Sequence, residues 1–444
     1  MRWAIGVLAL VLPWACGGAD DKGRDGAGAA DAIVDTASPD GTSLSDAPGV
    51  DAPDALPDVL ADLATDPAEA PGVEIRSDAD AQTPTYPTAI PLTFPLDGQP
   101  LLPVRVDGGE PRPFVVDTGA IRTAADPALL HDVANGVGTA TFDLGDGVVL
   151  PDYEVLAADL AEAVDVIGVP LQGLIGQDLF GQLWFGVDYR ARQGYVAPTA
   201  PDAAPPGYAT VPPVELPYDL VQGYPVVTVE VAGATLRLIA DTGSGVTLVD
   251  ASLLPPAVLE AGLVGYTWYT SYGSDPGTLV RLPDLELAGR SVPGTWAVAI
   301  PHQHHLSQLF SLMGIQVDGF LGYPVYREFF VGVRGADHAY DLWPCAEPDP
   351  LAATEWDRVA VEVRRDAGAT LIDMVFVPSD AATGGVQPQE RLLRVDGADA
   401  DALALDDLRR ALRGTPGEVR TLTLLREGLE VDVTVTVDHL LPIE

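Results

Sequence analysis

Residues 112–123, RPFVVDTGAIRT, and residues 236–250, LRLIADTGSGVTLVD, decide how this chain folds. Each stretch begins as an apolar run and ends at an aspartate, Asp117 in the first and Asp241 in the second. An acid at the end of a buried strand costs free energy unless something pairs with it or uses it. Because the chain places Asp-Thr-Gly after two apolar runs, we expect the two acids to share a purpose.

The sequence around the two motifs is duplicated. Residues 100–119 and residues 224–243 each predict a strand, a turn and a second strand that leads into the acid. Downstream, GLIGQDLFGQLWFGVDY (173–189) aligns without a gap with GFLGYPVYREFFVGVRG (319–335). Short apolar runs broken by Gly, Pro and Asp are typical of β structure. The pattern predicts two related, mostly β lobes at 89–200 and 205–345, joined by a Pro-rich segment.

A single Asp-Thr-Gly could be no more than an Asx turn that ends a strand. Here both copies follow strand hairpins at equivalent places in a duplicated unit. Each is also followed later by an apolar-apolar-Gly triplet, which spans 174–176 in the first copy and 320–322 in the second. These shared features favour a functional pair of aspartates over two unrelated turns.

With these duplicated motifs, residues 88–345 resemble the aspartic proteases, and most closely their retropepsin-like branch, here fused into one chain. The resemblance implies a bilobed β fold in which the carboxyl groups of Asp117 and Asp241 meet. It also implies an aspartic endopeptidase that needs no cofactor. In such an enzyme the carboxyl pair shares a proton and activates the water that hydrolyses a polypeptide substrate.

The same resemblance implies supporting roles within the two acid loops. Thr118 and Thr242 would cross-bond the loops beneath the acids, and Gly119 and Gly243 would allow the tight turns that present them. Ser244 would donate a hydrogen bond to a catalytic carboxylate.

Three further features lie near the expected site. The first is Arg122, which is unusual beside a pair of acids because a cation there would lower their pKa values. Covering hairpins are predicted at 139–155, with a turn at 145–147, and at 266–282, with a turn at 275–277. Tyr269 and Tyr272 of the second hairpin either cover a substrate or pack across strands.

The composition excludes several functions. Across 444 residues, 65 Asp and Glu outnumber 24 Lys and Arg, which gives a net charge of −41 and opposes binding to nucleic acid. His302, His304 and His305 are close in sequence, but their spacing matches no metal motif, so we expect an exposed loop and no metal. We expect a monomer.

The first 16 residues, MRWAIGVLALVLPWAC, have a cationic start, an apolar centre and a small residue before Cys16. They resemble a bacterial lipoprotein signal, which implies that Cys16 carries a lipid and is the only membrane anchor. The alternative is a conventionally cleaved secretory signal. Residues 17–88, rich in Ala, Asp and Pro, predict a disordered acidic tether. We therefore expect an exported cell-envelope lipoprotein anchored to the outer membrane.

Residues 350–440 predict a third, α+β unit. The pattern indicates a strand at 391–395, a turn at 396–397, a helix at 405–412 and two final strands joined at Arg426–Gly428. This order resembles a PDZ domain of the bacterial protease-associated type, which implies capture of a peptide C-terminus by strand addition. A purely structural cap is the alternative.

Two other functions remain open from the sequence. One is a catalytically inactive, protease-like envelope lipoprotein that binds peptides or proteins. The other is an acidic surface lipoprotein whose PDZ-like unit carries the function.

Overall fold

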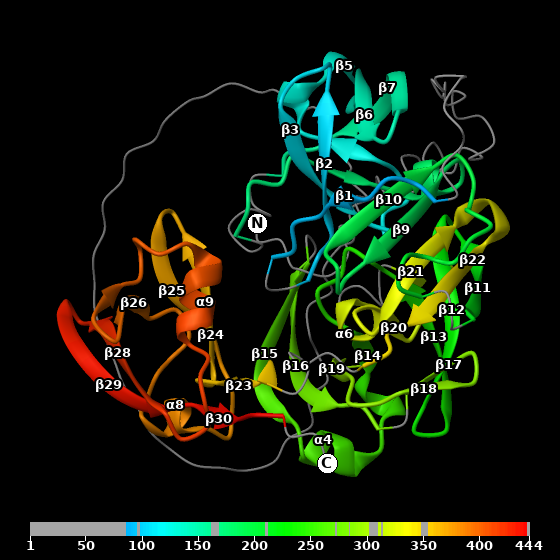
Figure 1. The fold of residues 1–444 in the computed structure, drawn as a ribbon. Coiled ribbons are helices and arrows are strands. Elements are labelled where there is room, and N and C mark those ends of the chain that lie inside the picture. The colour runs from blue at the N-terminus through cyan, green and yellow to red at the C-terminus, as the bar shows by residue number, and fades with distance from the viewer. Residues whose placement is uncertain are drawn as a thin grey trace, which may run out of the picture. The chain divides into compact units, whose positions relative to one another are not determined.

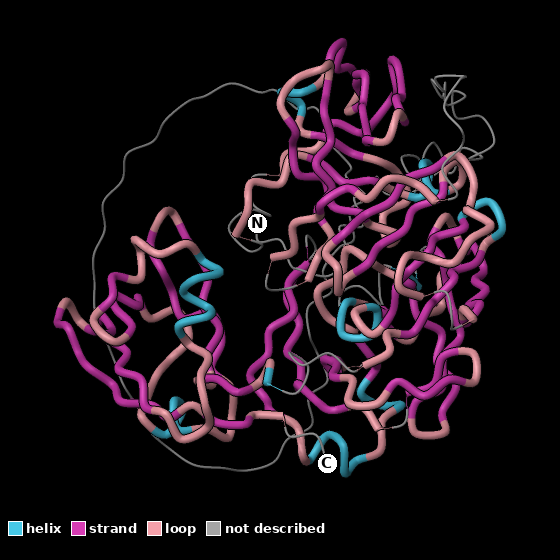
Figure 2. Tube along the Cα trace, in the orientation of Figure 1, coloured by secondary structure: helices cyan, strands magenta, loops and turns pink. Residues whose placement is uncertain are grey.

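The structure, a computed structural model, describes residues 86–95, 98–160, 168–208, 212–270, 273–283, 285–301, 310–311, 314–347 and 354–441. All of these residues belong to one compact unit. Strands make up most of the regular structure and the helices are short (Figures 1 and 2), so the mostly β fold class is confirmed. We call residues 86–208 the first repeat, 212–347 the second repeat and 354–441 the C-terminal unit.

Several expected features lie outside the described residues. They are the signal with Cys16, the tether as far as residue 85, the three neighbouring histidines (His302, His304 and His305), Tyr272 and the side chain of Tyr269. The lobe and domain boundaries drawn from the sequence stay predictions.

The first repeat is built on the hairpin β2–β3, whose second strand leads directly into Asp117. Strand β8 lies parallel to β3 and pairs Leu174 with Val115. The sheet follows the order β2-β3-β8-β4-β7-β6-β5. Its strands are β2 (Leu101–Val106), β3 (Pro111–Val116), β4 (Ala124–Ala125), β5 (His131–Ala134), β6 (Val137–Gly145), β7 (Val148–Ala157) and β8 (Gly173–Ile175).

The second repeat has the same arrangement around Asp241. Strand β13 leads into the acid, and strand β20 lies parallel to it, pairing Phe320 with Ile239. Its strands are β11 (Val214–Val221), β12 (Tyr224–Val231), β13 (Ala234–Ala240), β14 (Leu248–Asp250), β15 (Leu263–Thr270), β16 (Gly273–Arg281), β17 (Leu285–Leu287), β18 (Arg290–Val292), β19 (Trp296–Ile300) and β20 (Gly319–Leu321).

A shared sheet joins the two repeats, in the order β1-β10-β9-β21-β22-β11. Strands β9 and β21 are antiparallel neighbours, and Gly186 faces Gly332 in their register. These two glycines occupy equivalent positions of the duplicated sequence. Equivalent strands that pair antiparallel about equivalent residues are related by a local twofold axis. The other elements are β1 (Ile90–Pro91), β9 (Trp184–Asp188), β10 (Gln193–Ala197), β21 (Phe329–Arg334), β22 (Ala339–Pro344), α3 (Gln177–Phe180) and α6 (Tyr323–Tyr326).

Alternating burial explains why the strands form where they do. In β6, every second side chain is buried and those between are half-buried, as a strand with one face on a core requires. Strands β9 and β21 are buried along almost their whole length, because both faces of the shared sheet are covered. One large core cluster contains residues of both repeats, including Phe180, Tyr326 and Tyr340.

The covering hairpin of the first repeat confirms its predicted turn, and that of the second repeat does not. Strands β6 and β7 reverse at Asp146 and Gly147, both with positive φ. In the second repeat Asp275 and Pro276 lie inside β16, where Pro276 pairs with Thr267, and the chain reverses between Thr270 and Gly273. The Asp-Pro-Gly turn prediction was wrong there because pairing along the full hairpin overrides local turn preference.

The C-terminal unit has the sheet order β24-β25-β26-β28-β29. The expected strand, helix and final hairpin are confirmed as β26 (Arg391–Val395), α9 (Leu405–Ala411), β28 (Val419–Arg426) and β29 (Leu429–Thr436). The remaining elements are β23 (Asp357–Arg358), β24 (Val361–Asp366), β25 (Ala369–Val375), β27 (Ala398–Asp399), β30 (Asp438–His439) and α8 (Asp380–Thr383). No helix among the described residues is long and apolar enough to cross a membrane.

Candidate functional site

The two acid loops hang from the strands that run beside them. The backbone N–H of Asp117 donates to the Ile175 carbonyl over 3.0 Å, and that of Asp241 donates to the Leu321 carbonyl over 2.9 Å. The glycines that follow Ile175 and Leu321 are required because a side chain at either position would clash with the neighbouring backbone. A Cβ on Gly176 would lie 2.5 Å from the Arg122 backbone, and one on Gly322 would lie 2.1 Å from the Val246 carbonyl oxygen. The apolar-apolar-Gly triplets therefore hold the acid loops in place.

Thr118 and Thr242 tie the loops together through four hydrogen bonds. The N–H of Thr118 donates to Oγ1 of Thr242 over 3.1 Å, and the N–H of Thr242 donates to Oγ1 of Thr118 over 3.0 Å. Each hydroxyl then crosses to the other repeat. Oγ1 of Thr118 donates to the Ala240 carbonyl over 2.7 Å, and Oγ1 of Thr242 donates to the Val116 carbonyl over 2.6 Å. Both threonines are fully buried.

Gly119 and Gly243 bring each loop against the acid of the other repeat. A Cβ on Gly119 would lie 2.5 Å from Cγ of Asp241, and a Cβ on Gly243 would lie 2.6 Å from Cγ of Asp117. Real Cβ atoms do not approach this closely, so only glycine fits at either position. The reciprocal contact places the two carboxyl groups together on the local twofold axis.

The carboxyl groups form a buried, mutually hydrogen-bonded pair. Asp117 is 3% exposed and Asp241 is 0% exposed. Burial raises the pKa of Asp117 well above its ordinary value, and the adjacent Asp241 raises it further. Burial also raises the pKa of Asp241 to about 6. Two such acids do not both ionise easily, so they share a proton.

Each acid has one buried oxygen that receives no hydrogen bond from outside the pair among the described residues. These oxygens are Oδ1 of Asp117 and Oδ2 of Asp241. The pair therefore presents a donor and an acceptor side by side. A water molecule, or the C=O and N–H of a polypeptide backbone, would satisfy both.

Two residues of the acid loops behave differently from the sequence-based expectation. The Ser244 hydroxyl donates to the Val246 carbonyl over 2.7 Å and not to a carboxylate, because its own loop turns back on it. Its backbone N–H bonds the loop through the Asp241 carbonyl instead, over 3.3 Å. The guanidinium of Arg122 forms an ion pair with Glu154 of β7 over 3.2 Å.

Helix α3 contributes two residues that the sequence did not single out. The Gln177 amide donates to the Thr118 carbonyl over 2.6 Å and is buried. Asp178 accepts bonds from the backbone and hydroxyl of Thr123, over 2.8 and 2.7 Å. Their place directly after Gly176 was the available signal, since that glycine marks where the chain turns beneath the first acid loop.

Comparison with known proteins gives one short match. No protein-family model matches the chain. A protein of Mesorhizobium japonicum named as a putative zinc metalloprotease is 36% identical over 66 residues. The match spans 15% of this chain and 17% of that relative. The coarse relationship that it supports is to a protease.

The match corrects the more specific expectation. The sequence predicted an aspartic endopeptidase of the retropepsin-like kind, and the relative's name contradicts this, because it indicates a metallopeptidase. The described residues do not supply a zinc site either. They contain no group of three or more His, Cys, Asp and Glu side chains that could hold a metal ion.

Proposed function

We propose that this chain is a peptidase that binds an extended polypeptide at the pair formed by Asp117 and Asp241. The observation that supports the proposal is the buried carboxyl pair, in which one oxygen of each acid receives no hydrogen bond from outside the pair among the described residues. A proton-sharing pair offers both a donor and an acceptor, which match the C=O and N–H of a peptide backbone. The protease name of the relative agrees with the class.

We further propose that the C-terminal unit assists by binding a peptide. Strand β24 is the terminal strand of its sheet, so among the described residues one of its edges pairs with no other strand of that sheet and could accept an added strand. Helix α9 lies close to the same strand. For location, we propose export and a lipid anchor at Cys16, in line with the lipoprotein-like first 16 residues.

The experiment is a cleavage and binding assay on the full chain in detergent, with a mixed peptide library read by mass spectrometry. Asp117→Asn and Asp241→Asn remove the proton-sharing pair, and Asp202→Asn, at an exposed position, is the matched control. We expect the wild type and the control to cleave peptides, and both site variants to bind them at least tenfold more weakly. A parallel arm with a zinc chelator identifies the chemistry of cleavage. A chain that neither binds nor cleaves any peptide would overturn the proposal.

A further inference from the structure

The covering hairpins of the two repeats are held in different ways. In the first repeat, β6 pairs with β5 and β2, and β7 pairs with β4, so both strands have further neighbours within their own sheet. In the second repeat, β15 is the terminal strand of its sheet, and its neighbour in that sheet is β16. The outer edge of β15 is therefore left to an element from outside the sheet.

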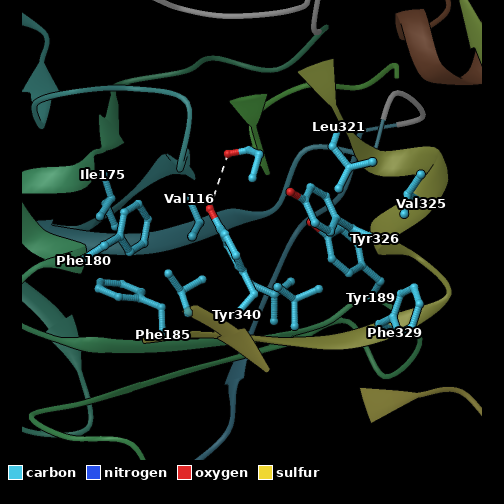
Figure 3. Close-up of a cluster of buried hydrophobic side chains, with 14 of the residues drawn as sticks. Val116, Ile175, Phe180, Phe185, Tyr189, Leu321, Val325, Tyr326, Phe329 and Tyr340 are labelled. Carbon is cyan, nitrogen blue, oxygen red and sulfur yellow. Dashed lines mark hydrogen bonds between the residues drawn. The ribbon is translucent and has the colours of Figure 1, made fainter. Parts of the chain in front are cut away.

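The hairpin β15–β16 packs against the strand that supports the second acid loop. Trp268 of β15 is 1% exposed, and its ring lies 6.2 Å from the ring of Phe320 in β20. The next residue, Leu321, accepts the backbone N–H of Asp241 and lies in the buried cluster that both repeats share (Figure 3). A displacement of this hairpin therefore takes Trp268 away from the support of the second acid loop.

The C-terminal unit occupies the outer edge of β15. The backbone N–H of Val264 donates to the Val377 carbonyl over 3.0 Å, and the N–H of Val377 donates to the Val264 carbonyl over 2.8 Å. At the next position of β15, a Cβ on Gly265 would lie 2.2 Å from the Val375 carbonyl oxygen, so the two backbones touch there. The end of β25 and the two residues after it thus lie along β15.

This contact extends further towards the turn of the hairpin than the support from inside the sheet does. Strand β19 pairs with β16 over Thr278–Arg281, which is the half of the hairpin away from the turn. The backbone N–H of Thr267 donates to Sδ of Met374 over 3.4 Å, and Thr267 pairs with Pro276, nearer the turn. Residues 374–377 therefore restrain a part of the hairpin with which β19 does not pair.

The C-terminal unit is also attached to parts of the second repeat other than this hairpin. Glu355 accepts hydrogen bonds from the Arg327 guanidinium over 2.6 Å and from the Trp296 indole over 2.8 Å. The rings of Trp296 and Trp356 lie 5.1 Å apart, edge to face. The C-terminal unit thus has a separate attachment that keeps it in place while it holds β15.

We propose that residues 374–377 of the C-terminal unit clamp the hairpin β15–β16 and so control the access of a polypeptide to the acid pair. Asp117 is 3% exposed and Asp241 is 0% exposed, so a polypeptide reaches them only if an element moves. The hairpin at the end of its sheet is that element, and release from the clamp is the step that frees it. The inference rests on the proposed function, because it concerns access to the same site.

The bonds of Val264 make release possible without unfolding the hairpin. Both of its backbone groups bond Val377, whereas the ladder between β15 and β16 uses the groups that point the other way. Breaking the two bonds to Val377 therefore leaves the hairpin intact.

The first test weakens the clamp and measures amide hydrogen exchange of the full chain in detergent by mass spectrometry. Val264→Pro removes the N–H that bonds Val377, and exchange in β15 and β16 should become about fivefold faster. Exchange in β6 and β7 should not change. Val264→Ala is the matched control, because it keeps the N–H and shortens a side chain that is 50% exposed, so exchange should stay as in the wild type.

The second test locks the clamp with Val264→Cys and Val377→Cys in one chain. Residues that exchange both backbone bonds have Cα atoms about 5.5 Å apart, which a disulfide can span. Oxidation should slow exchange in the hairpin and should slow binding of the mixed peptide library about tenfold, and a reductant should restore both. The wild type, which keeps Cys345, is treated in the same way as the control.

The outcomes separate the clamp from the proposed function. Unchanged exchange in folded Val264→Pro, or equal peptide binding by the oxidised and reduced double variant, would overturn the clamp. If Val264→Pro does not fold, the comparison of oxidised with reduced protein decides, because it is made within one folded chain. Faster exchange in Val264→Pro together with no peptide binding by any variant would support the clamp and overturn the proposed function.

Discussion

Thr118 and Thr242 bond each other reciprocally, with the N–H of each donating to the hydroxyl oxygen of the other. The two residues are 124 positions apart and belong to different repeats. Their hydroxyls also reach the carbonyls of Ala240 and Val116, so neither loop has its full set of hydrogen bonds without the other. The acid pair is therefore a joint product of both repeats.

Removing either hydroxyl should destabilise the fold. Thr118→Val or Thr242→Val leaves a buried N–H and a buried carbonyl of the partner loop without their bonds, which costs about 1–3 kcal/mol for each variant. The double variant should cost less than the sum, because both changes break one network. Urea unfolding measures this, with Thr228→Val at an exposed position of β12 as control. Single variants that each lose less than about 0.5 kcal/mol, with a double variant that loses their sum, would contradict the network.

A methyl group at Gly119 should also disrupt the site. Gly119→Ala places its Cβ 2.5 Å from Cγ of Asp241, so the loop or the acid must move. Overpacking of this kind costs about 1–3 kcal/mol. Gly181→Ala is the matched control, because its Cβ would meet its nearest neighbour at an ordinary 3.5 Å. Thermal unfolding compares the two variants, and equal melting temperatures would count against the close contact.

The acid pair should make stability depend on pH. The folded pKa of Asp241 is raised to about 6, above the value of about 3.9 for an unfolded aspartate. The contribution of Asp241 to the free energy of unfolding is therefore fully present below about pH 4 and is lost as the pH rises through about 6. Asp241→Asn should remove this loss.

The measurement is unfolding free energy from pH 3.5 to 8 for the wild type and Asp241→Asn. Their difference isolates the pair, because burial also raises the pKa of Asp178 and Asp188 in both proteins. A difference that stays flat across this range would show that Asp241 has an ordinary pKa.

A buried ion pair should hold the second repeat to the C-terminal unit. The Arg327 guanidinium donates to Glu355 over 2.6 Å, and the Trp296 indole donates to the same carboxylate over 2.8 Å. Glu355→Ala removes the nearer carboxylate from a cation that is 2% exposed and leaves Glu328 at 3.7 Å, so the loss should be at most about 3–5 kcal/mol. Denaturant unfolding should show this loss, whereas Glu418→Ala, in an exposed pair with Arg420, should change little.

The anchor prediction concerns Cys16. Cys16→Ala should prevent lipid attachment, so the chain should move from the membrane fraction to the soluble fraction after export. Fractionation and labelling with a fatty-acid analogue measure both effects. Cys345→Ala is the control, since Cys345 is a free cysteine of the folded part. Continued membrane binding and lipid labelling of Cys16→Ala would rule out this anchor.

Much of the fold follows from patterns that lie within short stretches. Alternating apolar residues predict the hairpin β6–β7, with its Asp-Gly turn, and the final hairpin β28–β29, with its turn at Glu427 and Gly428, because pairing there is between neighbours in sequence. The turn at Asp275 fails as a prediction because β15 and β16 pair beyond it. There, contacts across the hairpin outweigh the local preference of Asp-Pro-Gly.

Some residues of the candidate site can likewise be identified from the sequence, and others only from the structure. The duplicated Asp-Thr-Gly motifs are enough to identify Asp117 and Asp241, but Gln177 becomes part of the site only through its bond to the Thr118 carbonyl. Arg122 shows the reverse case, since its place in the sequence suggests the acids and its side chain pairs with Glu154. Sequence distance does not fix the direction of a side chain.

The sequence by itself determined the mostly β class, the duplication and the identity of the two acids, because these follow from local periodicity and repeated motifs. Only the tertiary structure decided that the acids meet, that the Ser244 hydroxyl donates to the Val246 carbonyl, and that Arg122 pairs with Glu154. The meeting of the acids depends on contacts between the two repeats, such as the pairing of β9 with β21, which bring distant parts of the chain together.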